Sequence, residues 1–130
     1  MPLQLTILRE VTMGKLTTHV LDTANGCPAN DLTIELFAID SASQKILLKT
    51  IVTNADGRTD LPLLADAELK VGVYELVFSV GAYFARFESD LMEVPFLDRV
   101  PIQFGVSDST AHYHVPLLAS PWAYSTYRGS

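Results

Sequence analysis

The chain has 130 residues, the size of a single domain, and 48% of them are hydrophobic. Nine lysines and arginines against fifteen aspartates and glutamates give a formal net charge of −6, and no cationic cluster occurs, which argues against nucleic-acid binding by phosphate neutralisation. Cys27 is the single cysteine, so an internal disulfide is excluded.

The N-terminal segment does not have the pattern of a signal peptide, because Arg9 and Glu10 interrupt its apolar run and no small-residue cleavage site follows. No run in the chain approaches the apolar length of a membrane helix. We therefore expect a cytoplasmic protein that does not insert into a membrane. We assign residues 1–15 to an N-terminal extension, which could be flexible, and residues 16–130 to one folded domain.

Hydrophobic residues recur with period two rather than 3.6, as in half-buried strands. Val100, Ile102, Phe104 and Val106, for example, alternate with smaller or more polar residues. Turn signals such as Asn25-Gly26 and Asp56-Gly57 separate the runs. The pattern predicts strands at 16–22, 31–40, 45–53, 59–62, 72–80, 99–106, 111–119 and 122–127.

Helical content is predicted to be small. One short helix is expected at 82–88, directly after a strand, and a helical turn could form at 66–70. Seven to eight short strands at this spacing are typical of an all-β, two-sheet sandwich.

His19 lies in the first predicted strand, on the face that also carries Thr17 and Leu21, while Thr18 and Val20 share the other face. A lone histidine on a strand is usually structural or exposed. A functional role is the alternative interpretation.

His112 and His114 are two residues apart on a predicted strand, so both side chains point to one face. Such a pair could bind a metal ion, but a metal site needs a third and usually a fourth ligand. His19 could be the third, and no carboxylate or thiolate is an evident fourth. The other interpretation is general acid–base catalysis, because imidazole titrates near neutral pH.

Arg58 follows the turn sequence Asn54-Ala55-Asp56-Gly57 and is either a solvated loop residue or a planar donor for a carboxylate or oxyanion.

The segment 121–130 stays aromatic close to its end, which indicates either a packed terminus or an edge strand with a frayed tip. No Gly-x-Ser-x-Gly nucleophile elbow occurs in the sequence.

Three segments together resemble the 5-hydroxyisourate hydrolase family, the enzymatic relatives of transthyretin, over about residues 16–130. The most specific one begins with His112-Tyr113-His114-Val115-Pro116-Leu117-Leu118 and closes with Tyr127-Arg128-Gly129-Ser130. The segments 17–22 and 53–58 also match. The resemblance implies a transthyretin-like (prealbumin) fold for a hydrolase domain at 16–130.

The resemblance also implies which residues form the site. The catalytic residues would be His19, Arg58, His114 and Ser130. Substrate would be bound by His19, Arg58, Tyr127 and Arg128. His112 would be a supporting residue, and no metal and no cofactor would be needed.

The implied reaction is ring-opening hydrolysis of 5-hydroxyisourate to 2-oxo-4-hydroxy-4-carboxy-5-ureidoimidazoline, a step of urate degradation in purine catabolism. The implied assembly is a homotetramer with a central channel and active sites at the dimer–dimer interface. The main alternative is a non-enzymatic, transthyretin-like carrier of a small aromatic ligand. A metal-binding β domain and a plain interaction module are further alternatives.

Overall fold

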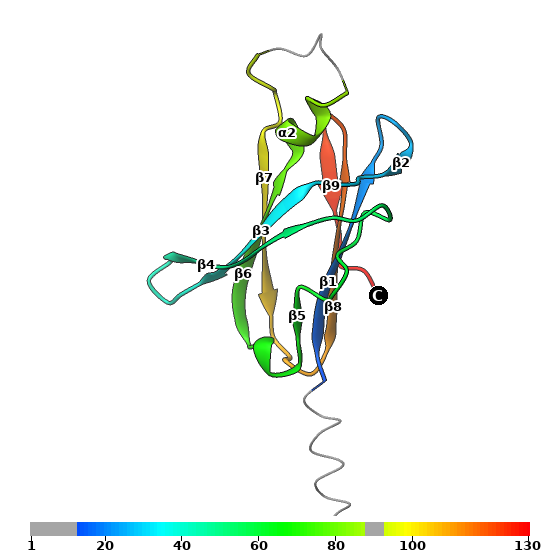
Figure 1. Ribbon diagram of the computed structural model, residues 1–130. Coiled ribbons are helices and arrows are strands. Elements are labelled where there is room, and N and C mark those ends of the chain that lie inside the picture. Colours follow the sequence, from blue (N-terminus) through cyan, green and yellow to red (C-terminus); the bar gives the residue numbers. More distant parts are fainter. Residues whose placement is uncertain (1–12, 88–92) are drawn as a thin grey trace, which may run out of the picture.

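The computed structural model describes residues 13–87 and 93–130, which form two β-sheets packed face to face (Figure 1). The first sheet, called sheet A, has strand order β2–β1–β8–β9, and β5 pairs with the same edge of β1 as β2 does. Its strands are β1 (Lys15–Asp22), β2 (Cys27–Pro28), β5 (Leu64–Ala65), β8 (His112–Ala119) and β9 (Tyr124–Thr126). The predicted all-β sandwich is confirmed.

The second sheet, sheet B, is fully antiparallel and has order β4–β3–β6–β7. Its strands are β3 (Thr33–Ile39), β4 (Lys45–Val52), β6 (Gly72–Ser79) and β7 (Arg99–Val106). In sheet A, by contrast, β1 and β8 run parallel, with Thr17 opposite His114. This parallel pair places the beginning of the folded domain beside its last long strand.

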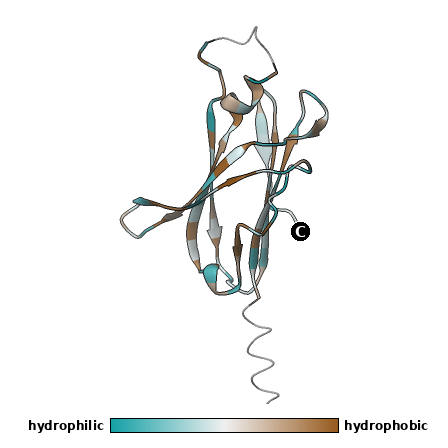
Figure 2. Cartoon of the chain, in the orientation of Figure 1, coloured by the Kyte–Doolittle hydropathy of each residue, from teal (hydrophilic) through white to brown (hydrophobic). Residues whose placement is uncertain are grey.

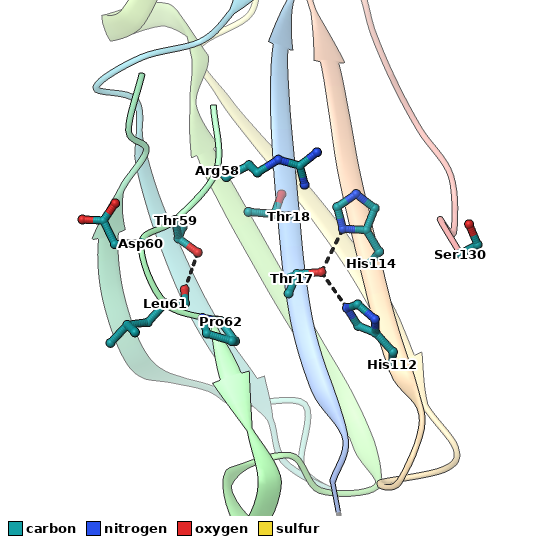
Figure 3. Close-up of a pocket in the computed structure, with 10 residues that line it drawn as sticks. All are labelled: Thr17, Thr18, Arg58, Thr59, Asp60, Leu61, Pro62, His112, His114 and Ser130. Carbon is teal, nitrogen blue, oxygen red and sulfur yellow. Dashed lines mark hydrogen bonds between the residues drawn. The ribbon is translucent and has the colours of Figure 1, made fainter. Parts of the chain in front are cut away.

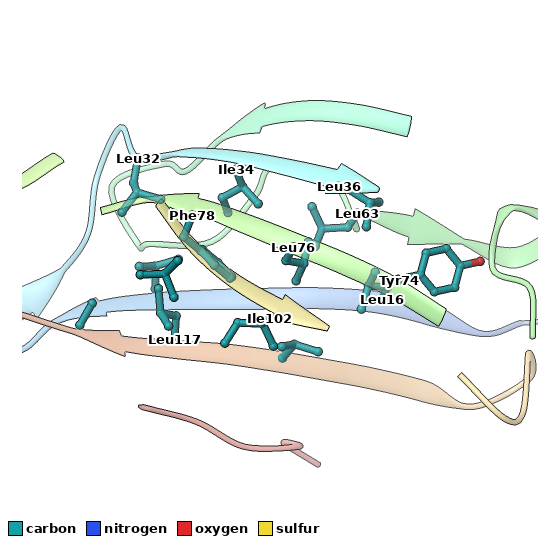
Figure 4. Packing of buried hydrophobic residues seen from close by; sticks show 14 of the residues in the cluster. Leu16, Leu32, Ile34, Leu36, Leu63, Tyr74, Leu76, Phe78, Ile102 and Leu117 are labelled. Carbon is teal, nitrogen blue, oxygen red and sulfur yellow. The ribbon is translucent and has the colours of Figure 1, made fainter. Parts of the chain in front are cut away.

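The core lies between the sheets and is formed by alternate strand residues (Figure 4). In β1, Leu16, Thr18, Val20 and Asp22 are buried, and the residues between them face outward. Brown and teal segments are interspersed along the strands in Figure 2. The face assignment predicted for His19 is therefore confirmed.

The predicted strand at 59–62 is wrong, because these residues form an irregular segment and pairing with β1 begins only at Leu64. Pro62 has no backbone N–H to donate to a sheet, and side-chain hydrogen bonds from Asn54 shape the chain before it. Strand β2 was not predicted.

The α-helix α2 (Val80–Phe84) begins two residues before the predicted one and ends earlier, while Glu88 lies outside the described residues. The helix follows β6 directly. Gly81 is needed there because a Cβ atom on it would lie 2.8 Å from Asp98 Oδ1. The predicted turn at 66–70 is confirmed as the 3-10 helix η1 (Asp66–Glu68).

Helix α2 is tied to sheet A by a buried hydrogen bond, in which the Tyr83 hydroxyl donates to Asp22 Oδ2 at 2.8 Å. The same carboxylate accepts the backbone N–H groups of Ala24 and Asn25. Asp22 is only 2% exposed, so these donors replace its hydration. We call this pair the Asp22–Tyr83 bond.

The predicted N-terminal extension, residues 1–15, lies largely outside the described residues, and β1 starts at Lys15. Within the described part of the chain, no helix is long and apolar enough to cross a membrane. The cytoplasmic location stays a prediction.

Candidate active site

The parallel pairing of β1 and β8 gathers polar side chains on the outer face of sheet A. Lys15 lies opposite His112 and Thr17 lies opposite His114. Parallel neighbours in register point to the same side of a sheet, so the two histidines of β8 stand beside Thr17. The prediction that His112 and His114 share one face is confirmed.

Thr17 makes hydrogen bonds to both histidines (Figure 3). Its Oγ1 lies 2.9 Å from His114 Nδ1 and 3.0 Å from His112 Nε2. His112 is exposed, whereas His114 is half-buried. The three side chains form one connected group, with Thr17 in the middle.

A pocket of about 430 Å³ lies over this group, and we call it the histidine pocket. One wall is formed by β1 and β8, and the opposite wall is the irregular segment 58–62 (Figure 3). The lining residues are Thr17, Thr18, Arg58, Thr59, Asp60, Leu61, Pro62, His112, His114 and Ser130. The structure thus brings together three of the four predicted catalytic residues.

The turn before Arg58 is held by the side chain of Asn54. Its Oδ1 accepts the backbone N–H groups of Asp56 at 2.9 Å and Arg58 at 3.2 Å, and its Nδ2 donates to Asp60 at 2.9 Å. Gly57 has φ of 74° and donates its N–H to Asn54 O at 2.9 Å. These bonds fix the direction in which Arg58 leaves the turn.

The same turn is docked on β1. The N–H of Val20 donates to Gly57 O at 2.8 Å, and a Cβ atom on Gly57 would collide with Val20 O. Close approach and positive φ therefore both require glycine at this position. The predicted turn at Asp56-Gly57 is the element that carries Arg58 to the sheet.

His19 lies two residues after Thr17 on the same face but does not line the histidine pocket. Its Nε2 lies 2.9 Å from Asp56 O. Because a carbonyl only accepts, Nε2 must carry the proton, and Nδ1 is the basic nitrogen of the neutral ring. His19 therefore connects β1 to the turn that presents Arg58.

Burial lowers the pKa of His114 below its ordinary value, and the neighbouring charges of Arg58, His112 and His19 lower it further. The ring is consequently neutral near pH 7. A neutral imidazole beside a guanidinium can accept a proton while the cation stabilises negative charge.

The C-terminal segment returns to β8 beside His114. Gly129 N donates to His114 O at 2.8 Å. A Cβ atom on Gly129 would lie 2.5 Å from His114 Cδ2, so only glycine lets the tail pack against this ring. Ser130 then reaches the histidine pocket.

Tyr127 and Arg128 lie elsewhere. They line a second pocket of about 260 Å³ between β7, β8 and β9. The Arg128 guanidinium sits 4.3 Å from the centroid of the Tyr113 ring, a cation–π contact. The Tyr127 side chain is largely exposed. In the single chain these two residues do not contribute to the histidine pocket.

The donor set suits proton transfer and oxyanion binding, since it combines two imidazoles, a hydroxyl and a guanidinium. Among residues 13–87 and 93–130, no group of three or more His, Cys, Asp or Glu side chains is arranged to hold a metal ion.

Sequence reasoning missed Thr17 and Asn54 as parts of the site. Thr17 could have been found from strand alternation, because it shares its face with His19. The contact between Gly129 and His114 depends on how the tail folds back, and no local pattern indicates that.

Comparisons with known proteins point in one direction. A sequence model described as the HIUase/Transthyretin family matches residues 16–129. The 5-hydroxyisourate hydrolase of Ralstonia nicotianae is 55% identical, over 91% of this chain and 100% of that protein. The 5-hydroxyisourate hydrolase of Mesorhizobium japonicum is 57% identical, over 90% of this chain and 93% of that protein.

Solved structures with similar folds include proteins of the same kind. The chain matches a crystal structure of (S)-allantoin synthase with a TM-score of 0.85 and 47% identity, covering 92% of this chain and 44% of that longer one. It matches 5-hydroxyisourate hydrolase of Klebsiella pneumoniae with a TM-score of 0.72 and 36% identity, over 90% and 94%. Sea bream transthyretin in complex with thyroxine gives a TM-score of 0.79 and 26% identity, over 88% and 94%.

Proposed function

The chain belongs to the HIUase/Transthyretin family, and from this premise we propose that it hydrolyses 5-hydroxyisourate in the histidine pocket. The observation that carries the proposal is the convergence of Arg58, His114 and Ser130 on one cavity. The product is 2-oxo-4-hydroxy-4-carboxy-5-ureidoimidazoline, formed by opening of the ring.

In the proposed mechanism His114 is the general base. It takes a proton from water as the water oxygen bonds to the ring carbonyl carbon. Arg58 faces the negative charge that develops on the carbonyl oxygen. When the carbon–nitrogen bond breaks, the proton passes to the leaving nitrogen, and the new carboxyl group stays on the product.

Roles for the remaining predicted residues are also part of the proposal. His19 does not line the histidine pocket, so it supports the site by holding the turn of Arg58 through Nε2, and its predicted catalytic and substrate-binding roles stay predictions. Ser130 borders the bound substrate. Tyr127 and Arg128 would bind substrate only if assembly or closure of the tail brought them to a pocket.

We further propose that the active form is a homotetramer. The histidine pocket opens on the outer face of sheet A, where another copy could cover it. Sedimentation equilibrium should give about four times the chain mass of 14.3 kDa. A fully active monomer would contradict this part of the proposal.

A carrier of a small aromatic ligand is the second candidate, because transthyretin shares the fold. It is less well supported, since a carrier has no need for a neutral imidazole beside a guanidinium.

The deciding experiment follows the absorbance of 5-hydroxyisourate, generated from urate by urate oxidase, with and without the protein. We expect the protein to accelerate the decay. His114→Gln should reduce kcat by at least about 10²-fold, the usual contribution of general acid–base catalysis. Decay at the spontaneous rate in the presence of wild-type protein would favour the carrier, and a fully active His114→Gln variant would remove His114 from the mechanism.

A further inference from the structure

The hydroxyl of Thr17 stands between two imidazole rings, 2.9 Å from His114 Nδ1 and 3.0 Å from His112 Nε2. A hydroxyl has one proton, so it can donate to only one of the two rings. The other ring must donate to the hydroxyl. The pair of bonds therefore couples the proton positions of His112 and His114.

The position of Thr17 is fixed more firmly than a surface side chain usually is. The residue is the third of the eight residues of β1 and lies directly opposite His114 in the parallel register. Its β-branched side chain has few rotamers. The hydroxyl is thus directed at the histidines by the sheet itself.

His114 is held from its other side as well. The backbone of Gly129 packs against the Cδ2 edge of the ring, where even a methyl group would collide. With Nδ1 turned to Thr17, the free ring nitrogen is Nε2, which has no hydrogen-bond partner in the described residues. Nε2 is therefore the atom available to substrate or water.

We propose that Thr17 is a positioning residue that accepts the Nδ1–H of His114 and donates its own proton to His112 Nε2. This arrangement leaves His114 Nε2 unprotonated and directed to proton transfer. The direction of the bonds rests on the proposed role of His114 as general base, because a base needs a bare nitrogen toward the reacting water. His112 then acts on His114 through Thr17.

The proposal predicts the tautomer of His114 in the resting protein. In ¹⁵N NMR of the full chain, at a pH above the pKa of His114, Nδ1 should show the chemical shift of a protonated ring nitrogen. Nε2 should show the chemical shift of an unprotonated ring nitrogen. The chain has only three histidines, so His19→Gln and His112→Gln variants assign the signals. An Nε2–H tautomer in the wild-type protein would overturn the proposal.

Two substitutions at the same position separate the hydroxyl from the shape of the side chain. Thr17→Val removes the hydroxyl but keeps the branched shape, and Thr17→Ser keeps the hydroxyl. Thr17→Val should lower kcat at least about tenfold, with a smaller change in KM, and should mix the two tautomers of His114. Thr17→Ser should stay within about threefold of wild type, because the bonds at 2.9 and 3.0 Å can still form.

Thr50→Val is the matched control, since Thr50 is an exposed threonine on β4 in the other sheet and should have no effect. Wild-type kcat for Thr17→Val, or equal loss in Thr17→Ser and Thr17→Val, would overturn the proposal. If Thr17→Val does not fold, the wild-type tautomer and Thr17→Ser still decide it. If wild-type protein fails to hydrolyse 5-hydroxyisourate, the proposed function falls, while the NMR measurement still tests the Thr17–His114 bond.

Discussion

Gly129→Ala tests whether the tail and His114 position one another. The new Cβ would lie 2.5 Å from His114 Cδ2, 3.1 Å from Cγ and 3.2 Å from Cβ of the same residue. Carbon atoms pack at about 3.5 Å or more, so the ring or the tail must shift by about 1 Å. A displacement of that size in a catalytic group can cost about 10²-fold in rate.

The stability of the variant should change little. Beyond β9 the tail is joined to β8 by the backbone bond from Gly129 N to His114 O and by the cation–π contact of Arg128 with Tyr113, and each contributes only about 1 kcal/mol. We therefore expect kcat to fall about 10²-fold while the free energy of unfolding falls by no more than about 2 kcal/mol. The absorbance assay and urea titration measure the two quantities.

Gly105→Ala is the control, because a Cβ atom there would meet no atom within 4 Å. It should leave kcat unchanged. Wild-type kcat and KM in Gly129→Ala would refute the reasoning, since His114 would then tolerate a displaced tail or a displaced ring. A large loss of stability instead would mean that the tail contributes to the core of the fold.

Three other predictions concern the site and the fold. Arg58→Lys should lower kcat/KM at least about tenfold despite the retained charge, because the planar donor pair is lost; wild-type turnover would reduce Arg58 to a simple cation. Burial, and then the charge of Arg58, lower the pKa of His114, so the base stays deprotonated in more acidic solution. The loss of kcat/KM on acidification should therefore have its midpoint below pH 6.5. A midpoint above that value would contradict the assignment of His114 as the base. Tyr83→Phe should leave kcat unchanged but lower the free energy of unfolding by about 1–3 kcal/mol, because the buried Asp22 carboxylate loses a donor; an unchanged urea midpoint would mean that the Asp22–Tyr83 bond adds no stability.

The sequence predicted the bounds of five long strands to within one residue. β1, β4, β6, β7 and β8 had been predicted at 16–22, 45–53, 72–80, 99–106 and 111–119. Burial alternates along β1 and β7, whereas β4 is mostly exposed and β6 mostly buried. The shared face of His112 and His114 follows from the period of two along a strand. Alternation is a local property, so it can be read from neighbouring residues alone.

The features that the sequence did not predict depend on contacts between residues that are far apart along the chain. The segment 59–62 was predicted as a strand, but Asn54 and Pro62 make it the wall of a pocket. Thr17 gained its role only because β8 lies beside β1 in parallel register. Such placements depend on residues distant along the chain, and no pattern in one segment contains them.

The parallel pairing of β1 and β8 also has a kinetic consequence. Thr17 and His114 are 97 positions apart, whereas β3 and β4 are neighbours joined by a short turn. Contacts of long sequence separation carry a larger chain-closure entropy and tend to slow folding. During refolding from urea, catalytic turnover should therefore return after most of the β-sheet circular dichroism has returned, so that hydrolysis reports on the last stage of assembly of the chain.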